Sequence, residues 1–179
     1  MAGWNILATA AEGRRDALLL SLRRLGARVR GGGYRNVVVG RVDDLPGFLD
    51  RVREALATDP LLPTALAKLV PIEATVRFTA EDAGPTLAAA AEPFLDRLAT
   101  GSFFVRLERR GLKGRVHSPT VERDVGGRLW QALEARGVTP RVDFADPDAI
   151  LAIETIGDEA GLTLLDRTLR RAYPFVKMR

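Results

Sequence analysis

Basic side chains cluster in one short stretch of this sequence, and their spacing predicts phosphate binding. The stretch begins in an apolar run, 103–107, and ends beside Ser118-Pro119, a residue pair typical of a helix start. Glycines let a backbone approach a ligand closely, and two of them, Gly111 and Gly114, lie among the basic residues. A basic, glycine-containing loop between a strand and a helix N-terminus is well shaped to hold a phosphate backbone. The basic residues are Arg106, Arg109, Arg110, Lys113 and Arg115.

The residues around this loop support the same interpretation. On a strand Arg106 faces opposite to Val105 and Leu107, so we expect its side chain to point away from the core. A helix that begins at Ser118 adds unsatisfied N–H groups and a positive dipole end. His117, the single histidine, could stack on a base or bond a phosphate, although a local hydrogen bond near the helix start explains it better than catalysis. A solvated basic hairpin without a ligand fits the composition about as well.

No pattern in the sequence assembles a catalytic or metal site. There are no cysteines and only one histidine, which makes a zinc site implausible. Gly31-Gly32-Gly33 does not continue into a dinucleotide-binding motif. Three acids, Asp143, Asp146 and Asp148, could suggest a metal or acid–base pair, but with Pro147 they directly precede an apolar run, which favours a turn. We therefore predict no catalytic residues, no metal and no cofactor.

The totals allow one large domain or two small ones. The chain has 179 residues, is 46% hydrophobic, and carries 27 Lys and Arg against 23 Asp and Glu, for a net charge of +4. Residues 101–130 alone also have a net charge of +4, so the basic excess is local. No apolar run approaches the roughly 20 residues that span a bilayer. These features, with the absence of cysteine, predict a cytoplasmic protein that does not contact membranes.

Periodicity in the first half predicts alternating strands and helices in the order βαββαβ. That order is the split-βαβ, ferredoxin-like arrangement, and it closes near residue 78. Asp43 or Asp44 is suited to cap the second helix. The expected elements are strands at 5–9, 27–30 and 36–40, helices at 12–25 and 45–56, and an extended segment within 66–78.

A boundary at 79–85 introduces a second set of elements, so we predict an α+β protein with domains at 1–78 and 79–179. Pro93 should interrupt the first helix of this set. Ser118 is the expected N-cap of the longest helix, and Gly137 its end. The expected elements are helices at 86–98, 118–136 and 166–172 and strands at 103–107, 149–155 and 161–165.

Three segments of the second half resemble the THUMP domain, over roughly residues 80–179. They are Ser102 to Arg110, Ser118 to Gly126, and Val142 to Asp148 followed by Ile150 to Glu154. The family's turn usually reads V-D-L-x-N-P-D, whereas Phe144 and Asp146 stand here in place of Leu and Asn. The first half resembles the ferredoxin-like domain that precedes THUMP. Short runs at 5–7, 70–73 and 173–177 look most like the stand-alone branch of the family.

The resemblance implies binding of tRNA at its acceptor stem and single-stranded 3′ end. Carried over residue by residue, it assigns RNA contacts to Arg106, Arg109, Arg110, Lys113, Arg115, His117 and Arg123, with Arg109, Lys113 and Arg115 as phosphate contacts. Arg14 with Arg15, and Arg170 with Arg171, are weaker basic patches.

The stand-alone branch further implies a non-catalytic adaptor that positions tRNA for a separate RNA acetyltransferase acting on cytidine. Two alternatives stay open. One is a general or ribosome-associated RNA-binding regulator without a modifying partner. The other is a small enzyme whose site the sequence does not reveal.

Overall fold

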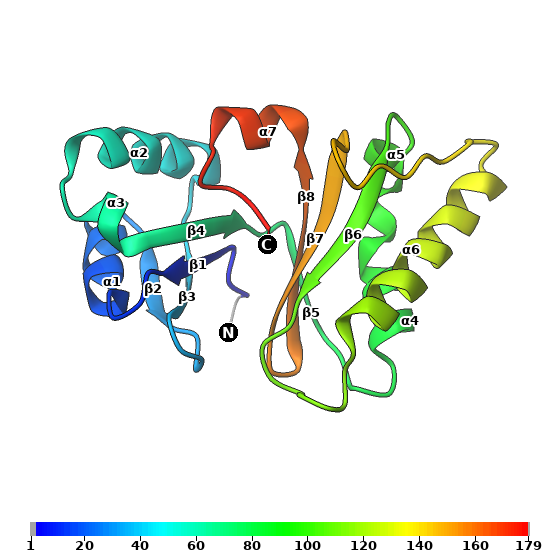
Figure 1. The fold of residues 1–179 in the computed structure, drawn as a ribbon, viewed down its shortest axis with the longest axis horizontal. Helices are drawn as coiled ribbons and strands as arrows, with labels where there is room; N and C mark the ends of the chain where they lie inside the picture. The colour runs from blue at the N-terminus through cyan, green and yellow to red at the C-terminus, as the bar shows by residue number, and fades with distance from the viewer. Residues whose placement is uncertain (1–2, 179) are drawn as a thin grey trace. The chain divides into compact units, whose positions relative to one another are not determined.

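The computed structural model describes residues 3–178, which form two compact units. The first unit comprises residues 3–72 with Arg170–Met178, and the second comprises Glu73–Leu169. The chain passes to the second unit after Ile72 and returns to the first at Arg170. Figure 1 follows the chain through both units. Among the described residues, no helix combines the length and the apolar character needed to cross a bilayer.

The first unit has the predicted βαββαβ order around one antiparallel sheet. The strand order is β2-β3-β1-β4, and in the central strand β1 Leu7 lies opposite Val39 on one side and Val70 on the other. A short helix, α3, was not predicted. The elements are β1 (Ile6–Ala10), α1 (Arg15–Arg24), β2 (Arg28–Gly31), β3 (Val37–Arg41), α2 (Leu45–Thr58), α3 (Leu62–Ala65) and β4 (Leu66–Pro71).

The helices of the first unit pack apolar stripes against its sheet. In α1, Leu18 and Leu22 are one turn apart and fully buried. Helix α2 is capped by Asp44, whose side chain accepts a hydrogen bond from the Gly47 N–H at 3.1 Å. The buried stripe of α2 consists of Phe48, Leu49 and Val52.

The C-terminal segment belongs to the first unit. The Leu69 N–H donates to the Phe175 carbonyl at 3.0 Å, which attaches this segment to β4. The Tyr173 hydroxyl donates to Asp50 Oδ1 on α2 at 2.7 Å, and this bond is the leading cause of the raised pKa of Tyr173. The Arg53 guanidinium carbon lies 5.1 Å from the Tyr173 ring centroid.

The second unit is a four-stranded sheet in the order β5-β8-β7-β6, with one face covered by α4 and α6 (Figure 1). Strands β6 and β7 are parallel, and the other pairs are antiparallel. The elements are β5 (Ala74–Arg77), α4 (Ala83–Ala91), the 3₁₀ turn η1 (Glu92–Phe94), α5 (Leu95–Leu98), β6 (Phe103–Glu108), α6 (Ser118–Ala135), β7 (Ala149–Ile156), β8 (Glu159–Asp166) and α7 (Arg167–Ala172), whose last residues belong to the first unit.

Two boundaries differ from the sequence expectation. The predicted domain limit at residue 78 lies beyond the limit of the compact unit, because β5 was not foreseen and pairs with β8, where Thr75 lies opposite Gly161. The last predicted helix forms, but the chain that follows it returns to the first unit. The interruption expected at Pro93 is observed, as the 3₁₀ turn between α4 and α5.

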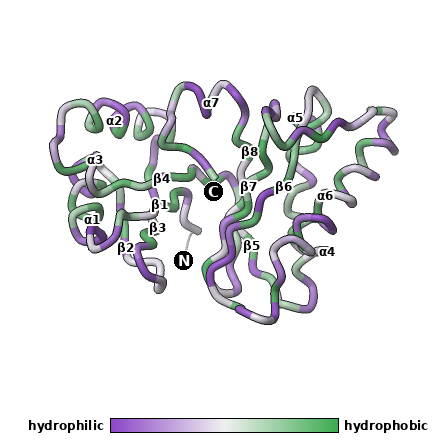
Figure 2. The backbone as a smooth tube through the Cα atoms, in the orientation of Figure 1, coloured by the Kyte–Doolittle hydropathy of each residue, from purple (hydrophilic) through white to green (hydrophobic). Residues whose placement is uncertain are grey.

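Helix α6 contributes one buried ridge to the second core, beside the buried residues of α4, η1 and α5. Val121, Val125, Leu129 and Leu133 form the predicted ridge and are buried. In Figure 2 the tube of α6 alternates between hydrophobic and hydrophilic colours, as expected for a helix with one buried face. Gly137 has a φ of 76° and ends the helix as predicted. The predicted N-cap was wrong by one residue: His117 occupies the cap position and Ser118 begins the helix.

Candidate nucleic-acid interface

Strand β6 separates apolar and polar side chains by simple alternation. Val105 and Leu107 are buried in the core with α4 and α6, whereas Arg106 projects from the opposite face and is 41% exposed. This orientation is the predicted one. β6 is an edge strand, and on that edge Glu122 of α6 accepts a hydrogen bond from the Leu107 N–H at 2.7 Å. Arg106 and Glu108 are thus the partly exposed side chains of β6, at the end of the strand that joins the basic loop.

The basic loop, residues 109–117, has a defined shape. Gly111, Leu112 and Gly114 all have positive φ values, of 88°, 50° and 79°. The N–H groups of Arg115 and Val116 both donate to the Leu112 carbonyl at 3.0 Å, which closes a turn. Val116 is buried and anchors the loop in the core, and the Arg109 guanidinium donates to the Gly111 carbonyl within the loop. The predicted glycines therefore serve the turn itself.

Four of the predicted RNA contacts are exposed on or beside this loop: Lys113, Arg115, His117 and Arg123. Among residues 3–178, neither Lys113 nor Arg123 forms an ion pair. Arg115 bonds Glu81 at 2.8 Å, and that hydrogen bond is the first cause of the lowered pKa of Glu81. An exposed pair of this kind contributes little to stability and can exchange for a phosphate.

Arg110 has an internal role that the sequence did not reveal. Its side chain is only 14% exposed and pairs with Glu154, which is completely buried on β7, and with Glu108 at 3.4 Å. Its backbone N–H donates to Thr155 Oγ1 at 3.0 Å. A guanidinium committed to a buried carboxylate is unavailable to RNA. The structure therefore corrects the assignment of Arg110 as an RNA contact.

His117 and Arg106 occupy intermediate positions. The His117 ring bonds Thr120 Oγ1 through Nδ1 at 2.9 Å, which is the local hydrogen bond considered from the sequence and leaves the rest of the ring exposed. Arg106 approaches Glu122 at 3.9 Å, a long and weak contact. Its guanidinium carbon lies 5.4 Å from the centroid of the Phe104 ring.

The acidic turn before β7 is structural, as the sequence favoured. Asp143 Oδ1 accepts hydrogen bonds from the N–H groups of Asp146 and Ala145, and these bonds lower its pKa. Asp148 accepts from the N–H of Ser102 at 2.8 Å and from the Ser102 hydroxyl at 3.1 Å, and its pKa is lowered for that reason. Arg167 closes the network at 3.2 Å from Asp148.

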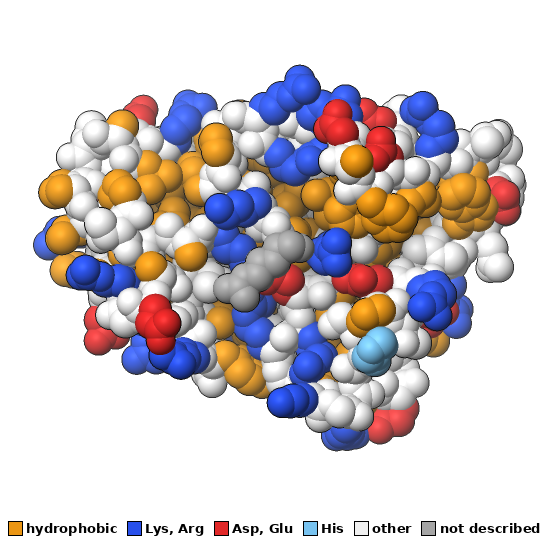
Figure 3. Space-filling view, viewed as in Figure 1, with side chains coloured by type: hydrophobic (Ala, Val, Ile, Leu, Met, Phe, Trp, Pro, Cys, Tyr) orange, Lys and Arg blue, Asp and Glu red, His pale blue; other side chains and the backbone are white. Residues whose placement is uncertain are grey.

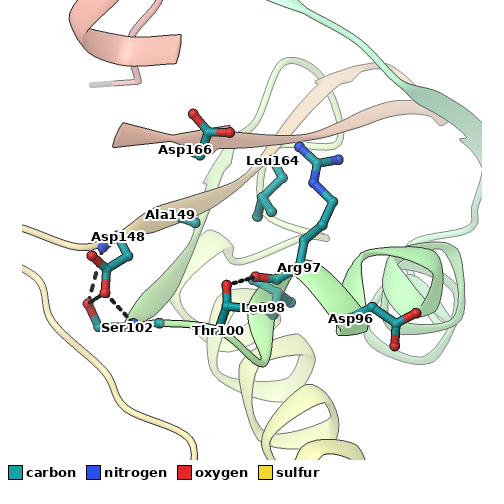
Figure 4. Close-up of a pocket in the computed structure, with 10 residues that line it drawn as sticks. Asp96, Arg97, Leu98, Thr100, Ser102, Asp148, Ala149, Leu164 and Asp166 are labelled. Atoms are coloured by element: carbon teal, nitrogen blue, oxygen red, sulfur yellow. Dashed lines mark hydrogen bonds between the residues drawn. The ribbon is translucent and has the colours of Figure 1, made fainter. Parts of the chain in front are cut away.

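Figure 4 shows a pocket beside this network, with a volume of about 340 Å³. Its charged and polar lining includes Asp96, Arg97, Ser102, Asp148 and Asp166. Three of these five residues are acids, and Arg97 is already paired with Glu73 at 2.7 Å. The pocket is therefore unsuited to a phosphate. Within residues 3–178 no cluster of three or more His, Cys, Asp or Glu side chains could hold a metal ion.

The sequence did not lead us to expect the exposed aromatic residue of the acidic turn, Phe144. Phe144 is 74% exposed, and its ring centroid lies 5.4 Å from that of Phe104 on β6. The available signal was a large aromatic residue in an otherwise polar turn, at the position where the family pattern has Leu. In Figure 3 basic and hydrophobic side chains lie close together on the visible face of the second unit.

The weaker basic patches lie in the first unit. Arg14 and Arg15 are exposed at the start of α1, and Arg15 contacts Asp16 at 3.6 Å. Arg171 is exposed at the end of α7, whereas Arg170 is only partly so.

Residues 86–165 match the THUMP domain family, so the second unit contains a THUMP domain, which implies RNA binding. No protein of curated function matches the sequence significantly. Among solved structures, TrmN from Thermus thermophilus is 29% identical, with a TM-score of 0.62 over 96% of this chain and 48% of that chain.

Two further solved structures share the fold. PH1313 from Pyrococcus horikoshii Ot3 is 11% identical, with a TM-score of 0.59, over 91% of this chain and 54% of that one. A 4-thiouridine synthetase, solved as an RNA complex with bound ATP, is 13% identical with a TM-score of 0.58, over 91% and 41%. The chain thus spans about half the length of the proteins that it resembles.

Proposed function

We propose that this chain is a non-catalytic tRNA-binding adaptor, which holds the acceptor stem and 3′ end of tRNA for a separate modifying enzyme. The observation that carries the proposal is the basic loop of the THUMP domain, where Lys113 and Arg115 are exposed on a backbone of defined shape, with Arg123 exposed on the adjoining helix α6. A tRNA ligand is further supported by the family match and by the RNA in the complex of the structurally similar 4-thiouridine synthetase.

The side chains of the loop are chemically suited to bind the end of an RNA duplex. A-form RNA is recognised through its shape, its 2′-hydroxyls and its phosphates, because side chains cannot read its narrow major groove. Arg115 and Arg123 can form bidentate contacts with phosphate oxygens, and Lys113 adds a mobile point charge. The first turn of α6 follows directly and places the positive end of the helix dipole beside the loop, although Pro119 has no N–H and the N–H groups of Thr120 and Val121 already donate to the His117 carbonyl.

The proposed mechanism is positioning. An adaptor that holds the acceptor end fixes the distance from that end to the base being modified, and the partner enzyme supplies the reaction. We propose an RNA acetyltransferase acting on cytidine as that partner, in the cytoplasm, because the runs at 5–7, 70–73 and 173–177 resemble the stand-alone THUMP proteins.

Titration of the full chain with tRNA at several salt concentrations tests the binding. The double variant Lys113→Glu with Arg115→Glu should lower affinity at least about 10-fold and reduce the slope of log K against log salt by about 2, because each lost phosphate contact reduces it by about 1. The matched control is Arg24→Glu with Arg136→Glu, which changes the net charge equally at exposed sites outside the loop. Equal losses in the two variants would contradict a specific interface.

Capture of partners from a cell lysate tests the adaptor role. Recovery of an RNA acetyltransferase with the wild-type chain supports the full proposal. Recovery of a different RNA-modifying enzyme overturns the acetylation assignment and leaves tRNA binding intact. Recovery of ribosomes alone favours the regulatory alternative.

A further inference from the structure

In the turn before β7 the aromatic ring of Phe144 is exposed to solvent, and this exposure does not stabilise the fold. Phe144 is the most exposed large hydrophobic side chain among residues 3–178, at 74%. One side of its ring rests near Phe104, at 5.4 Å between centroids and 34° between planes. A ring used only for packing would bury more of its area, since burial is what stabilises an apolar side chain.

The backbone around Phe144 is held in place. Asp143 Oδ1 accepts hydrogen bonds from the N–H groups of Ala145 at 2.8 Å and Asp146 at 3.0 Å, so the residues on both sides of Phe144 belong to one closed turn. Asp146 is in turn paired with Arg167 at 3.1 Å. The exposed ring is therefore preorganised, which lowers the entropy cost of binding to it.

A cation completes the arrangement. The Arg106 guanidinium carbon lies 5.4 Å from the Phe104 ring centroid, while Phe144 approaches the same ring. The three side chains form a row, which we name the aromatic row: Arg106, Phe104 and Phe144. Phe104 is its buried member, whereas Phe144 is 74% exposed and the Arg106 side chain is 41% exposed.

We propose that the aromatic row is a stacking platform for one unpaired nucleobase of the bound RNA. This inference rests on the proposed function and adds to it a contact that phosphate recognition does not supply. Every base has a π-face, so stacking on Phe144 would hold a single-stranded nucleotide whatever its sequence. Arg106 would lie beside the stacked base, where it can pair with the adjoining phosphate or stack in its turn.

Charge within the aromatic row favours RNA over an apolar protein partner, because Arg106 is a cation. The neighbouring carboxylates of Asp143, Asp146 and Asp148 are already engaged by backbone N–H groups, Ser102 and Arg167. The row begins on β6, and Arg109 at the start of the basic loop is the fifth residue after Phe104, about 17 Å away along an extended chain. A single RNA strand a few nucleotides long can therefore contact both. Arg141, which directly precedes the turn, is exposed and forms only a long ion pair with Asp148, at 3.9 Å.

Substitutions of Phe144 separate stacking from packing. Phe144→Leu retains an apolar side chain against Phe104 but removes the π-face, so it should weaken tRNA binding about 10-fold, within the range measured for loss of one base–aromatic stack. Phe144→Trp should retain wild-type affinity. The matched control is Val142→Ala, which truncates a second exposed hydrophobic residue, 47% exposed, in the same turn and should bind normally.

Fluorescence reports the stacking directly. tRNA carrying 2-aminopurine in place of the 3′-terminal base, and tRNA carrying it in the anticodon loop, are each titrated with the full-length variants. Quenching of one probe by the wild type and Phe144→Trp, but not by Phe144→Leu, supports the platform and identifies which unpaired region supplies the base.

The outcomes distinguish the two proposals. If Phe144→Leu binds and quenches as the wild type does, while the Lys113 and Arg115 double variant loses affinity, the stacking platform is wrong and tRNA binding stands. If the wild-type chain binds no tRNA, the proposed function fails with it. If Phe144→Leu changes the oligomeric state in gel filtration and leaves RNA affinity unaltered, the row is a protein contact and the inference is overturned.

Discussion

Two charged segments lie at opposite ends of the parallel pair β6 and β7 (Figure 1). They differ in how far their charged side chains are paired within the protein. The acidic turn, residues 142–148, precedes β7, and its carboxylates are engaged by Ser102, Arg167 and backbone N–H groups. The basic loop, residues 109–117, follows β6 and leaves Lys113 without an ion pair among the described residues. Charged side chains that are paired locally stabilise the conformation of the chain, whereas charged side chains that remain exposed can bind a partner.

The same contrast between paired and exposed charged side chains is found within the basic loop. Arg110 is a neighbour of Arg109 in sequence but is bound to the buried Glu154, whereas Lys113 and Arg115 extend into solvent. A net charge counted over a window cannot separate these roles. The burial of the partner carboxylate decides which arginine maintains the fold and which can contact RNA.

The largest expected effect on stability comes from Arg110. Arg110→Ala leaves the buried carboxylate of Glu154 without its arginine and should lower the free energy of unfolding by roughly 3–5 kcal/mol. Urea unfolding measures this loss. Lys113→Ala is the control and should change stability by no more than about 0.5 kcal/mol. Similar stabilities for the two variants would show that Arg110 contributes no more to the fold than the exposed Lys113 does.

A smaller effect is expected in the acidic turn. The Ser102 hydroxyl both donates to Asp148 Oδ2 and accepts from the Asp148 N–H, each at 3.1 Å. Ser102→Ala removes both bonds and should lower the melting temperature by less than Arg110→Ala does. Because Ser102→Ala loosens the turn but leaves Phe144 itself unchanged, tRNA affinity at a temperature where the variant is folded should fall by less than it does in Phe144→Leu. A larger loss of affinity would place Ser102 in the interface instead.

The smallest effect concerns pH. The pKa of Asp148 is lowered by hydrogen bonds from the N–H and hydroxyl of Ser102, and that of Asp143 by the N–H groups of Asp146 and Ala145. A lowered folded-state pKa gives stability that is present above the unfolded pKa, near 3.9, and is lost as pH falls through the folded value.

Unfolding measured from pH 7 to pH 2 should therefore show stability declining below about pH 4. Asp148→Asn should flatten part of that decline, and NMR titration should give Asp148 a pKa below its ordinary value. A carboxyl that titrates normally would show that the network seen around Asp148 does not persist in solution.

Sequence reasoning succeeded where the information is local. The alternation of Val105, Arg106 and Leu107, the ridge from Val121 to Leu133 and the stop at Gly137 all follow from residue spacing or backbone conformation. It failed at β5, a four-residue strand with no strong apolar pattern that exists because β8 lies beside it. The cap at His117 was missed by one residue, since helix ends are set by local contacts finer than composition.

By itself the sequence determined the order of strands and helices apart from α3 and β5, the basic loop and its glycines, and the resemblance to THUMP domains, because each depends on residues close together in the chain. Only the tertiary structure decided that Arg110 meets Glu154, 44 positions away, and that Phe144 comes to rest beside Phe104. Pairings of that kind are set by the register of β6 against β7 and by the path of the connecting turn. Local periodicity does not indicate which distant segment a residue contacts. Which basic side chains are paired internally and which are exposed can therefore be seen only in the folded chain.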